Sequence, residues 1–371
     1  MNFDLNEDAE LLKALTERFV TDHYDAERRR GYLAEAFGFS ASNWVLLGEL
    51  GLLAAPFDAE HGGLELDATA IATVFEVLGR GLAVDPLIEN ILVAGRLFAA
   101  TAPAALRDEW LPGLLDGSRR LALAHSEARG RPGRLWVECA ASADSSGTRL
   151  NGAKAYVPAG AGVDAYLVSA RTTGNADSPE GVALHLVPAN SPGLTCQQWR
   201  MADGSIAVSL RLDGVPVDHG SKLIGGSEAI EAGEVLASLA RSSETIGIME
   251  RIFAETQDYL RTREQFGAKL SSFQALQHRM VAQYAAIEQG RALLNLAQVS
   301  WGKPEFAQAV AGARAFIAPA SIELGHEMIQ FHGGMGVTDE LSIGNAHKRL
   351  LVLSRWPDDP DAALDRFAGI A

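Results

Sequence analysis

The stretch EMIQFHGGMGVTDE, residues 327–340, governs how the C-terminal part of the chain is interpreted. It ends a long run in which apolar residues recur at helical spacing, and it places Gly333, Gly334 and Gly336 within four positions. One glycine with a positive φ is enough to cap a helix. The additional glycines therefore indicate that the backbone comes close to another group, because glycine has no Cβ to prevent that approach.

Composition limits the classes of protein that need to be considered. With 371 residues the chain is long enough for two or three packed units. A net charge of −15 argues against nucleic acid and anionic membranes as partners. Two cysteines are too few for a disulfide framework or a structural metal site, and they fit a reducing compartment. No leader-like or membrane-spanning run occurs, so we expect a cytoplasmic protein without a metal.

The hydrophobic pattern changes twice along the chain. Residues 1–118 show helical spacing, as in AELLKALTERFV, and predict an N-terminal α-helical domain. Residues 119–223 consist of short runs rich in β-branched and aromatic residues, which predict a middle antiparallel β-barrel or sandwich. Helical spacing returns over 224–371 and predicts a C-terminal four-helix bundle. The expected fold class is therefore α+β and multidomain.

Glycine and proline positions predict where the helices of residues 224–371 begin and end. A long helix is expected from Ser227 to Phe266, where Gly267 breaks the pattern. A second helix should run to about Trp301, a third from Pro304 toward Gln330, and a short fourth one after Glu340.

Three separated segments resemble the acyl-CoA dehydrogenase family. RTREQFGAKLSSFQALQHRM (261–280) is similar to its Arg-x-x-Phe-Gly signature, residues 327–340 to its Gln-x-x-Gly-Gly-x-Gly, and WVLLGELGLLAAPFDAEHGG (44–63) to its N-terminal Trp and Gly-Gly pattern. Weaker similarities are AHSE (124–127) and TRLNGAKAYV (148–157). The resemblance implies FAD as cofactor, an acyl-CoA as substrate and an electron-transfer flavoprotein as acceptor. It also implies a tetramer, either of identical chains or of the α2β2 kind.

The resemblance carries a set of FAD contacts onto this chain. Arg263 matches the pyrophosphate-binding Arg, whose planar fork of donors suits two phosphates. Gly333 and Gly334 match the segment that a partner subunit brings to the adenosine end of FAD. Ser126 matches a hydroxyl bonded to the flavin ring. The full set of candidates is Arg263, Gln265, Phe266, Phe273, Gln274, Gln330, Gly333, Gly334 and Ser126.

The chain departs from the family where a catalytic carboxylate is required. Counting from the glycine segment, Pro357 occupies the usual Glu position, and the alternative position on the long helix is Ala237. Neither residue can remove a proton. Asp358 is one position away and can act as the base or belong to a turn. Glu244 can act as a displaced base or form an ion pair with Arg241 on one helix face.

Further departures lie around the flavin ring and the substrate. Pro158 stands where the family has a Thr near flavin N5, and Tyr156 stands where a Trp usually covers the ring. ARGRPGR (128–134) replaces the family's Gly-x-Gly-Ser-Asp loop. The apolar segment 85–100 should border the acyl tail, and it permits bulky acyl groups.

Three functions remain open at this point. The first is an FAD-dependent dehydrogenase that desaturates an acyl-CoA thioester, possible substrates including steroid-derived ones. The second is a base-less FAD-binding or structural subunit of an α2β2 acyl-CoA dehydrogenase. The third is a nitroalkane-oxidase-like flavoprotein in which Asp358 takes the proton.

Overall fold

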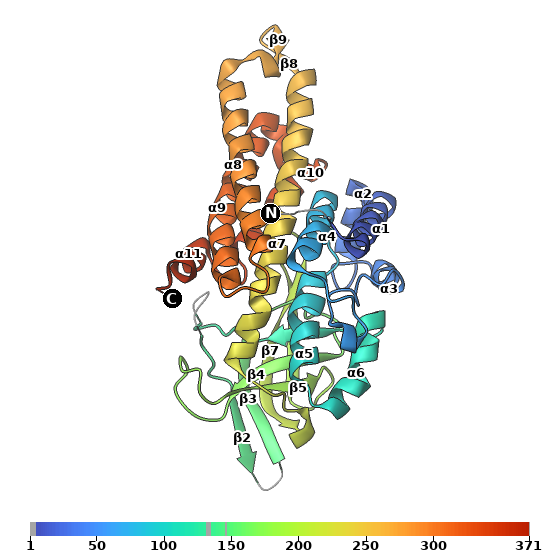
Figure 1. Ribbon diagram of the computed structural model, residues 1–371, viewed down its shortest axis with the longest axis vertical. Coiled ribbons are helices and arrows are strands. Elements are labelled where there is room, and N and C mark those ends of the chain that lie inside the picture. The colour runs from blue at the N-terminus through green and yellow to red at the C-terminus, as the bar shows by residue number, and fades with distance from the viewer. Residues whose placement is uncertain (1–4, 131–134, 145–146, 371) are drawn as a thin grey trace. The chain divides into compact units, whose positions relative to one another are not determined.

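The computed structural model describes residues 5–130, 135–144 and 147–370 (Figure 1). The chain divides into two compact units, and each is discontinuous in sequence. The first unit contains Met1–Gly31, Asp67–Ala83 and Ser238–Ala371. The second unit contains Tyr32–Leu66 and Val84–Ala237. The division into three domains at residues 118 and 223 remains a prediction based on element type.

Helices make up the N-terminal part of the chain, as the hydrophobic spacing predicts. They are α1 (Glu7–His23), α2 (Ala26–Ala34), α3 (Ala41–Glu49), α4 (Ala68–Gly81), a π-helical segment (Leu87–Gly95), α5 (Arg96–Thr101) and α6 (Ala104–Asp116). Asn6, Ser40 and Asp67 cap α1, α3 and α4 through side-chain oxygens that accept backbone N–H groups. Among the described helices, none is both long and apolar enough to cross a membrane.

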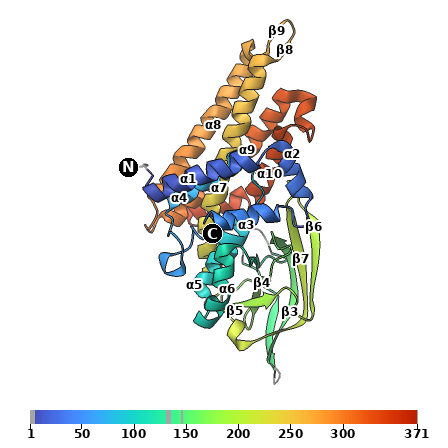
Figure 2. The ribbon, with the colours of Figure 1, turned by 90° about the vertical axis from the view of Figure 1, so that its right-hand side faces the viewer.

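The middle of the chain forms one curled sheet that belongs to the second unit. Its strands are β1 (Leu121–Ala124), β2 (Ala140–Asp144), β3 (Gly147–Pro158), β4 (Ala165–Arg171), β5 (Val182–Pro188), β6 (Leu194–Arg200) and β7 (Ile206–Val217). The order is β1-β4-β2-β3-β7-β6, with β5 on β4. Figure 2 shows β3, β7 and β6 of this sheet. Most pairs are antiparallel, whereas β4 pairs in parallel with β1 and, at one position, with β2. β4 is buried throughout and β6 is largely exposed at the edge.

A buried arginine at the start of β1 ties α3 to this sheet. Arg120 donates to the carbonyl of Gly162 at 2.7 Å and lies 4.8 Å from the ring centroid of Phe39 and 6.0 Å from that of Trp44. Burial lowers the pKa of Arg120 to about 10, so the guanidinium is still charged at neutral pH. Cation–π attraction therefore adds to hydrophobic contact where helix and sheet meet.

The C-terminal part contains α7 (Ser227–Thr262), α8 (Gln274–Val299), α9 (Phe306–His332), α10 (Ser342–Arg355) and α11 (Pro360–Ala368). α7 and α8 run side by side and are joined by a hairpin of β8 (Glu264–Gln265) and β9 (Ala268–Lys269) (Figures 1 and 2). α7 ends at Thr262, short of the predicted Phe266, because the backbone turns at Phe266 and Gly267 with φ of 56° and 77°. With a helical, then β, then helical order, the structure confirms the predicted fold class.

In the first unit, α4 and α7 cross with their backbones in close contact. A Cβ on Gly79 would lie 2.2 Å from the carbonyl oxygen of Glu244, and one on Gly247 would lie 2.1 Å from that of Glu76. Neither carbonyl belongs to a flexible side-chain end, so neither could give way. The crossing therefore requires glycine at both positions.

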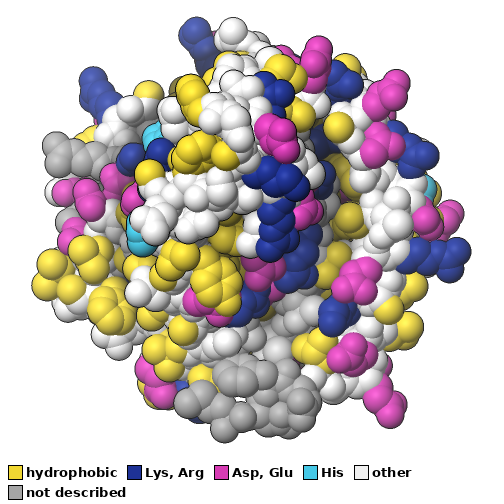
Figure 3. Space-filling model, turned by 90° about the horizontal axis from the view of Figure 1, so that it is seen from above, with side chains coloured by type: hydrophobic (Ala, Val, Ile, Leu, Met, Phe, Trp, Pro, Cys, Tyr) yellow, Lys and Arg dark blue, Asp and Glu magenta, His cyan; other side chains and the backbone are white. Residues whose placement is uncertain are grey.

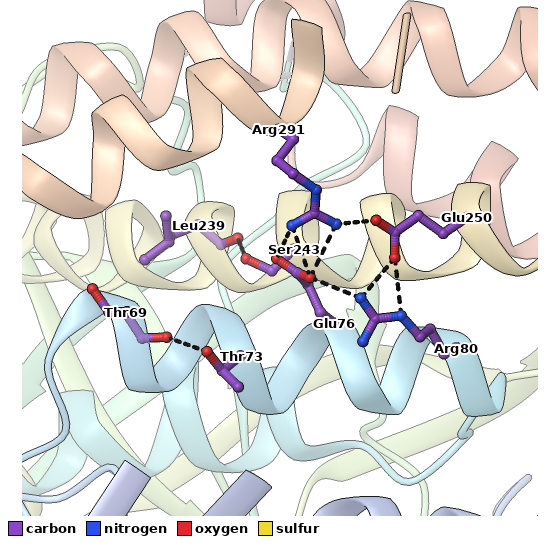
Figure 4. Close-up of polar contacts among 8 residues, drawn as sticks. All are labelled: Thr69, Thr73, Glu76, Arg80, Leu239, Ser243, Glu250 and Arg291. Carbon is purple, nitrogen blue, oxygen red and sulfur yellow. Dashed lines mark hydrogen bonds and ion pairs between the residues drawn. The ribbon is translucent and has the colours of Figure 1, made fainter. Parts of the chain in front are cut away.

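A four-residue ion network lies beside this crossing and joins α4, α7 and α8 (Figure 4). Glu76 accepts hydrogen bonds from Arg80 and Arg291, each at 3.2 Å. Glu250 accepts from Arg80 at 2.6 Å and also from Arg291. Burial raises the pKa of Glu76, while the guanidinium groups of Arg291 and Arg80 oppose that rise. The alternation of charge thus compensates for removing the carboxylate from water.

We expect Glu76→Gln to destabilise the protein by about 1.5–3 kcal/mol, because two charge-assisted hydrogen bonds lose their ionised acceptor. Urea unfolding followed by circular dichroism measures the change. Asp22→Asn, which removes an exposed ion pair with Arg18 on α1, should change stability by less than about 0.5 kcal/mol. Equal effects of the two substitutions would contradict a structural role for the network.

Candidate functional site

The hairpin between α7 and α8 carries most of the residues predicted to contact FAD. Arg263, Gln265 and Gln274 are exposed there. Phe266 exposes 93% of its surface, and its ring meets that of Phe273 edge-on at 6.4 Å. Seen from above, hydrophobic and basic side chains are exposed close to one another (Figure 3). An almost fully exposed aromatic ring on a strained left-handed residue indicates a surface that another group covers.

The three glycines of residues 327–340 turn out to have different roles. Gly333 ends α9 with φ 60° and ψ −141°, a conformation that other residues avoid. A Cβ on Gly336 would lie 2.6 Å from the carbonyl oxygen of Ile329, so packing within the chain requires glycine there. Around Gly334, a Cβ would meet nothing within 4 Å. This open backbone, beside the exposed Gln330, is where an outside group can approach.

The structure brings the glycine segment and the hairpin to the same end of the first unit. The ring of His332, at the end of α9, stacks on Tyr259 of α7 with centroids 4.3 Å apart. The carbonyl of Tyr259 in turn accepts a hydrogen bond from the backbone N–H of Arg263. His332 is buried and contacts the carbonyl of Met328 through Nδ1, so its role is to pack the end of α9 against α7.

Ser126, the remaining FAD candidate, lies in the second unit just after β1. Its carbonyl accepts a hydrogen bond from the N–H of Ala155 at 2.9 Å, and Ser126 pairs with Tyr156 as an isolated bridge. The pairing of β3 with β7 shifts register between Lys154 and Val157, so a bulge lies at this point. Bulges re-aim side chains and are common beside functional sites.

Next to Ser126 is a buried polar cluster that the sequence reasoning missed. The ammonium of Lys154 donates to Glu127 Oε1 at 2.6 Å, to Ser169 Oγ at 2.9 Å and to the carbonyl of His125 at 3.2 Å. Ser169 Oγ also lies 2.9 Å from His125 Nδ1. Both charged residues fall in the weakly similar segments AHSE and TRLNGAKAYV, and a lysine within a predicted strand interior was the available signal.

An aromatic pair lies beside Ser126, whose bridge partner is Tyr156. Tyr156, at the position of the family's ring-covering Trp, packs against Trp199 of β6 with centroids 5.5 Å apart. Its hydroxyl contacts the sulfur of Met201 at 3.2 Å, and the indole N–H of Trp199 donates to Ser209. An indole is therefore present near this position, but it comes from a different strand. Pro158 lies at the end of β3, opposite Ala207.

The two candidate bases are both held by arginines. Glu244 is buried, and its two oxygens accept from Nε and an Nη atom of Arg349 at 2.7 and 3.0 Å. Asp358 is buried as well, accepts from Arg314 Nε at 2.6 Å and forms an ion pair with Arg366. Paired in this way, each carboxylate has a structural role.

The other positions noted for the substrate side are located as follows. Ala237 and Arg241 are buried on α7, and Pro357 follows Trp356 in a cis peptide bond. Of the loop 128–134, residues 131–134 lie outside the described part of the chain.

One group of side chains has ligand spacing for a metal. Asp58, Glu60 and His61 place one ligand atom each within 4.8 Å of one another. Two of the three are exposed acids, and the guanidinium of Arg96 lies 3.6 Å from Asp58. A nearby cation opposes the binding of another, so we assign no metal to this group.

Comparison with known proteins gives a consistent result along the chain. The profile "Acyl-CoA dehydrogenase, N-terminal domain" matches residues 6–118, and "Acyl-CoA dehydrogenase, C-terminal domain" matches residues 237–356. Acyl-CoA dehydrogenase FadE27 of Mycobacterium tuberculosis is 29% identical, with 91% of this chain and 90% of that protein covered. The human mitochondrial short-chain specific acyl-CoA dehydrogenase is 27% identical, over 82% of this chain and 76% of its own.

Two solved structures are similar over almost the whole chain. A variant of the Tcur3481–Tcur3483 steroid ACAD shares 30% identity and a TM-score of 0.84, covering 98% of this chain and 97% of its own. The ChsE4–ChsE5 complex from Mycobacterium tuberculosis shares 26% identity and a TM-score of 0.88, covering 100% and 98%.

The buried cluster makes a prediction about acid stability. Burial, aided by the Lys154 charge, lowers the pKa of His125 to about 3. Between pH 6.5 and that value the unfolded chain binds a proton that the folded chain does not, so stability falls as the pH falls. We expect His125→Asn to lose about 2 kcal/mol less than the parent protein between pH 7.5 and 5, as measured by urea unfolding.

His278→Asn provides the matched control, because His278 is exposed on α8. It should show the same loss of stability on acidification as the parent protein. If His125→Asn also shows the parental loss, the histidine is not held neutral by the cluster.

Proposed function

Because the chain belongs to the acyl-CoA dehydrogenase family, we propose that it is an FAD-binding subunit that works with a homologous partner chain. The reaction served is the α,β-desaturation of an acyl-CoA thioester. The partner supplies the carboxylate that removes the α-proton. Family membership does not distinguish such a subunit from a catalytic chain. The distinction rests on the partners of the acidic side chains Glu244 and Asp358.

The observation that carries the proposal is the pairing of both candidate bases. A general base must present a carboxylate with a free lone pair to the substrate. The oxygens of Glu244 are engaged by the fork of Arg349, and Asp358 lies between Arg314 and Arg366. Freeing either carboxylate would break an ion pair in a largely buried place, at a cost of several kcal/mol. Pro357 and Ala237 occupy the usual positions and carry no base.

The residues of the adenosine end, by contrast, fit a dinucleotide. Arg263 presents an exposed guanidinium that suits a pyrophosphate, beside the exposed ring of Phe266. The open backbone at Gly334 suits close approach by a partner-held FAD, in keeping with a site that two chains complete. When bound, FAD accepts the hydride from the β-carbon of the acyl group. The role of this chain is to bind and orient the cofactor.

We propose an α2β2 assembly and a bulky, steroid-like acyl group. Both are supported by the similarity to the Tcur3481–Tcur3483 steroid ACAD, whose name joins two components. The segment that should border the acyl tail includes the π-helical stretch Leu87–Gly95, which is apolar over most of its length. Electrons would pass from the flavin to an electron-transfer flavoprotein. A homotetramer is the corresponding assembly if the chain acts without a different partner.

A single-chain enzyme is the second candidate, because Glu244 lies on α7 two turns beyond Ala237, near the alternative base position of the family. Release from Arg349 would then be part of its catalytic cycle. The nitroalkane-oxidase-like alternative requires Asp358 as base, and two arginine partners disfavour it.

One measurement distinguishes the FAD-binding subunit from the single-chain enzyme. The chain is purified alone and together with a co-expressed homologue, and flavin absorbance near 450 nm is recorded before and after addition of a steroid-derived acyl-CoA. We expect bound FAD and bleaching only with the partner present. Full flavin content and bleaching by the single chain would identify Glu244 as the base to test next, and would exclude the proposed subunit role.

The glycine segment gives a second prediction. Gly334→Ala should leave the urea midpoint unchanged, because its Cβ meets nothing within the chain, and should lower the FAD content of the assembly by about tenfold. Gly336→Ala, the matched control, should reduce stability instead, because its Cβ would meet the Ile329 carbonyl. Unchanged FAD content in a folded Gly334→Ala assembly would show that no cofactor approaches this backbone.

A further inference from the structure

The ammonium of Lys154 is buried within the second unit, and its side chain has no exposed surface. An ammonium has three N–H donors and needs an acceptor for each when it is withdrawn from water. The structure supplies three, from Glu127, Ser169 and the backbone of His125. Every donor is therefore satisfied, and the orientation of the ammonium is fixed.

Stability alone does not account for a charge at this place. Burial lowers the pKa of Lys154, which is the sign of a charged form at a disadvantage. Well-packed apolar residues often replace a buried ion pair without loss of stability. The neighbouring core positions on the sheet are apolar, Leu150 and Val157 among them. We therefore explain the charged pair by the way it positions the neighbouring backbone, and not by a gain in stability.

That backbone is the segment His125–Ser126–Glu127. Lys154 holds the carbonyl of His125 on one side of Ser126 and the carboxylate of Glu127 on the other. The same carboxylate accepts the backbone N–H groups of Glu138 and Cys139 at 2.6 and 3.1 Å, which fixes its own position. Ser126 itself is bonded to the β3 bulge through the N–H of Ala155. Both neighbours of Ser126 thus contact the same ammonium.

The side chain of Ser126 points away from this cluster in an extended segment, since side chains alternate between the two faces. Its neighbours point into the cluster, where Ser169 bonds to both His125 and Lys154. A displacement of a few tenths of an ångström at Lys154 would therefore be passed to the Ser126 hydroxyl without any direct contact between the two side chains.

We propose that Lys154, together with Glu127, is a positioning residue that sets the orientation of the Ser126 hydroxyl toward the flavin ring. The inference rests on the proposed FAD site and names a residue pair that does not touch the cofactor. It assigns a function in cofactor binding to an ion pair that is almost fully buried.

A double-mutant cycle tests the proposal on the full chain, co-expressed with its partner if the chain alone does not retain FAD. The variants are Ser126→Ala, Lys154→Met and the combination, and the readouts are the Kd for FAD, the flavin absorbance spectrum and the urea midpoint. We expect each single substitution to raise the Kd by about tenfold, the effect of one lost hydrogen bond. The combination should raise it no further, because Lys154 acts through Ser126.

Two additional variants keep the test decisive. Lys154→Met/Glu127→Gln removes both charges and should fold, while showing the same altered flavin spectrum as Lys154→Met. Arg120→Met removes the buried cation at the opposite end of β1 and should lower the urea midpoint without changing the spectrum or the Kd.

The outcomes separate the inference from the proposed function. If the parent assembly binds no FAD under any condition, the proposed function is wrong. If the parent binds FAD, the inference is overturned by Kd values that multiply in the combined variant, or by Lys154 variants that lose stability alone and bind FAD as the parent does.

Discussion

The crossing of α4 and α7 is the constraint on which the first unit depends. Gly79 and Gly247 allow the two backbones to touch, and this contact brings Glu76 of α4 within reach of Glu250 on α7. Two carboxylates at such a place would repel each other, and Arg80 and Arg291 resolve the repulsion by bonding to both. Arg291 also extends the network to α8. A backbone contact thus determines where charges must be placed, and the charges in turn join a third helix to the pair.

Arginine–carboxylate pairs also hold the two candidate bases, Glu244 and Asp358. Glu244 lies at the crossing itself, on α7, and is paired with Arg349 of α10. Asp358 links α9 to α11 through Arg314 and Arg366. Both candidate bases therefore form ion pairs that join one helix to another. An acid that stabilises a helix contact is a poor base, because it would first have to give up the guanidinium that holds it. Under the proposed function, the ion pairs that join the helices also keep both candidate carboxylates from acting as the base.

The sequence was most informative where local chemistry determines the structure. Phe266-Gly267 predicted a break in the long helix, and the spacing of residues 327–340 predicted a helix end with an unusual backbone; both features are present. Pairings between distant segments could not be predicted from one sequence. For Glu244 the sequence left open a displaced base and an ion pair with Arg241, and it gave no sign of the bonds that its carboxylate makes with Arg349. Lys154 lies on β3 and Glu127 in the segment after β1, and only the folded sheet brings them together.

The discontinuity of the first unit has a consequence for how the protein is made. Met1–Gly31 and Asp67–Ala83 pack with residues that begin at Ser238. During synthesis from the N-terminus, α4 emerges early with most of its residues apolar and later buried, yet α7 and α8 leave the ribosome only after the whole sheet has been translated. α1 can cover part of α4 early, but the part that packs on α7 and α8 stays uncovered until those helices are made, and such exposed apolar surface favours aggregation of a nascent chain. The first unit therefore cannot be completed before the sheet of the second unit has been synthesised.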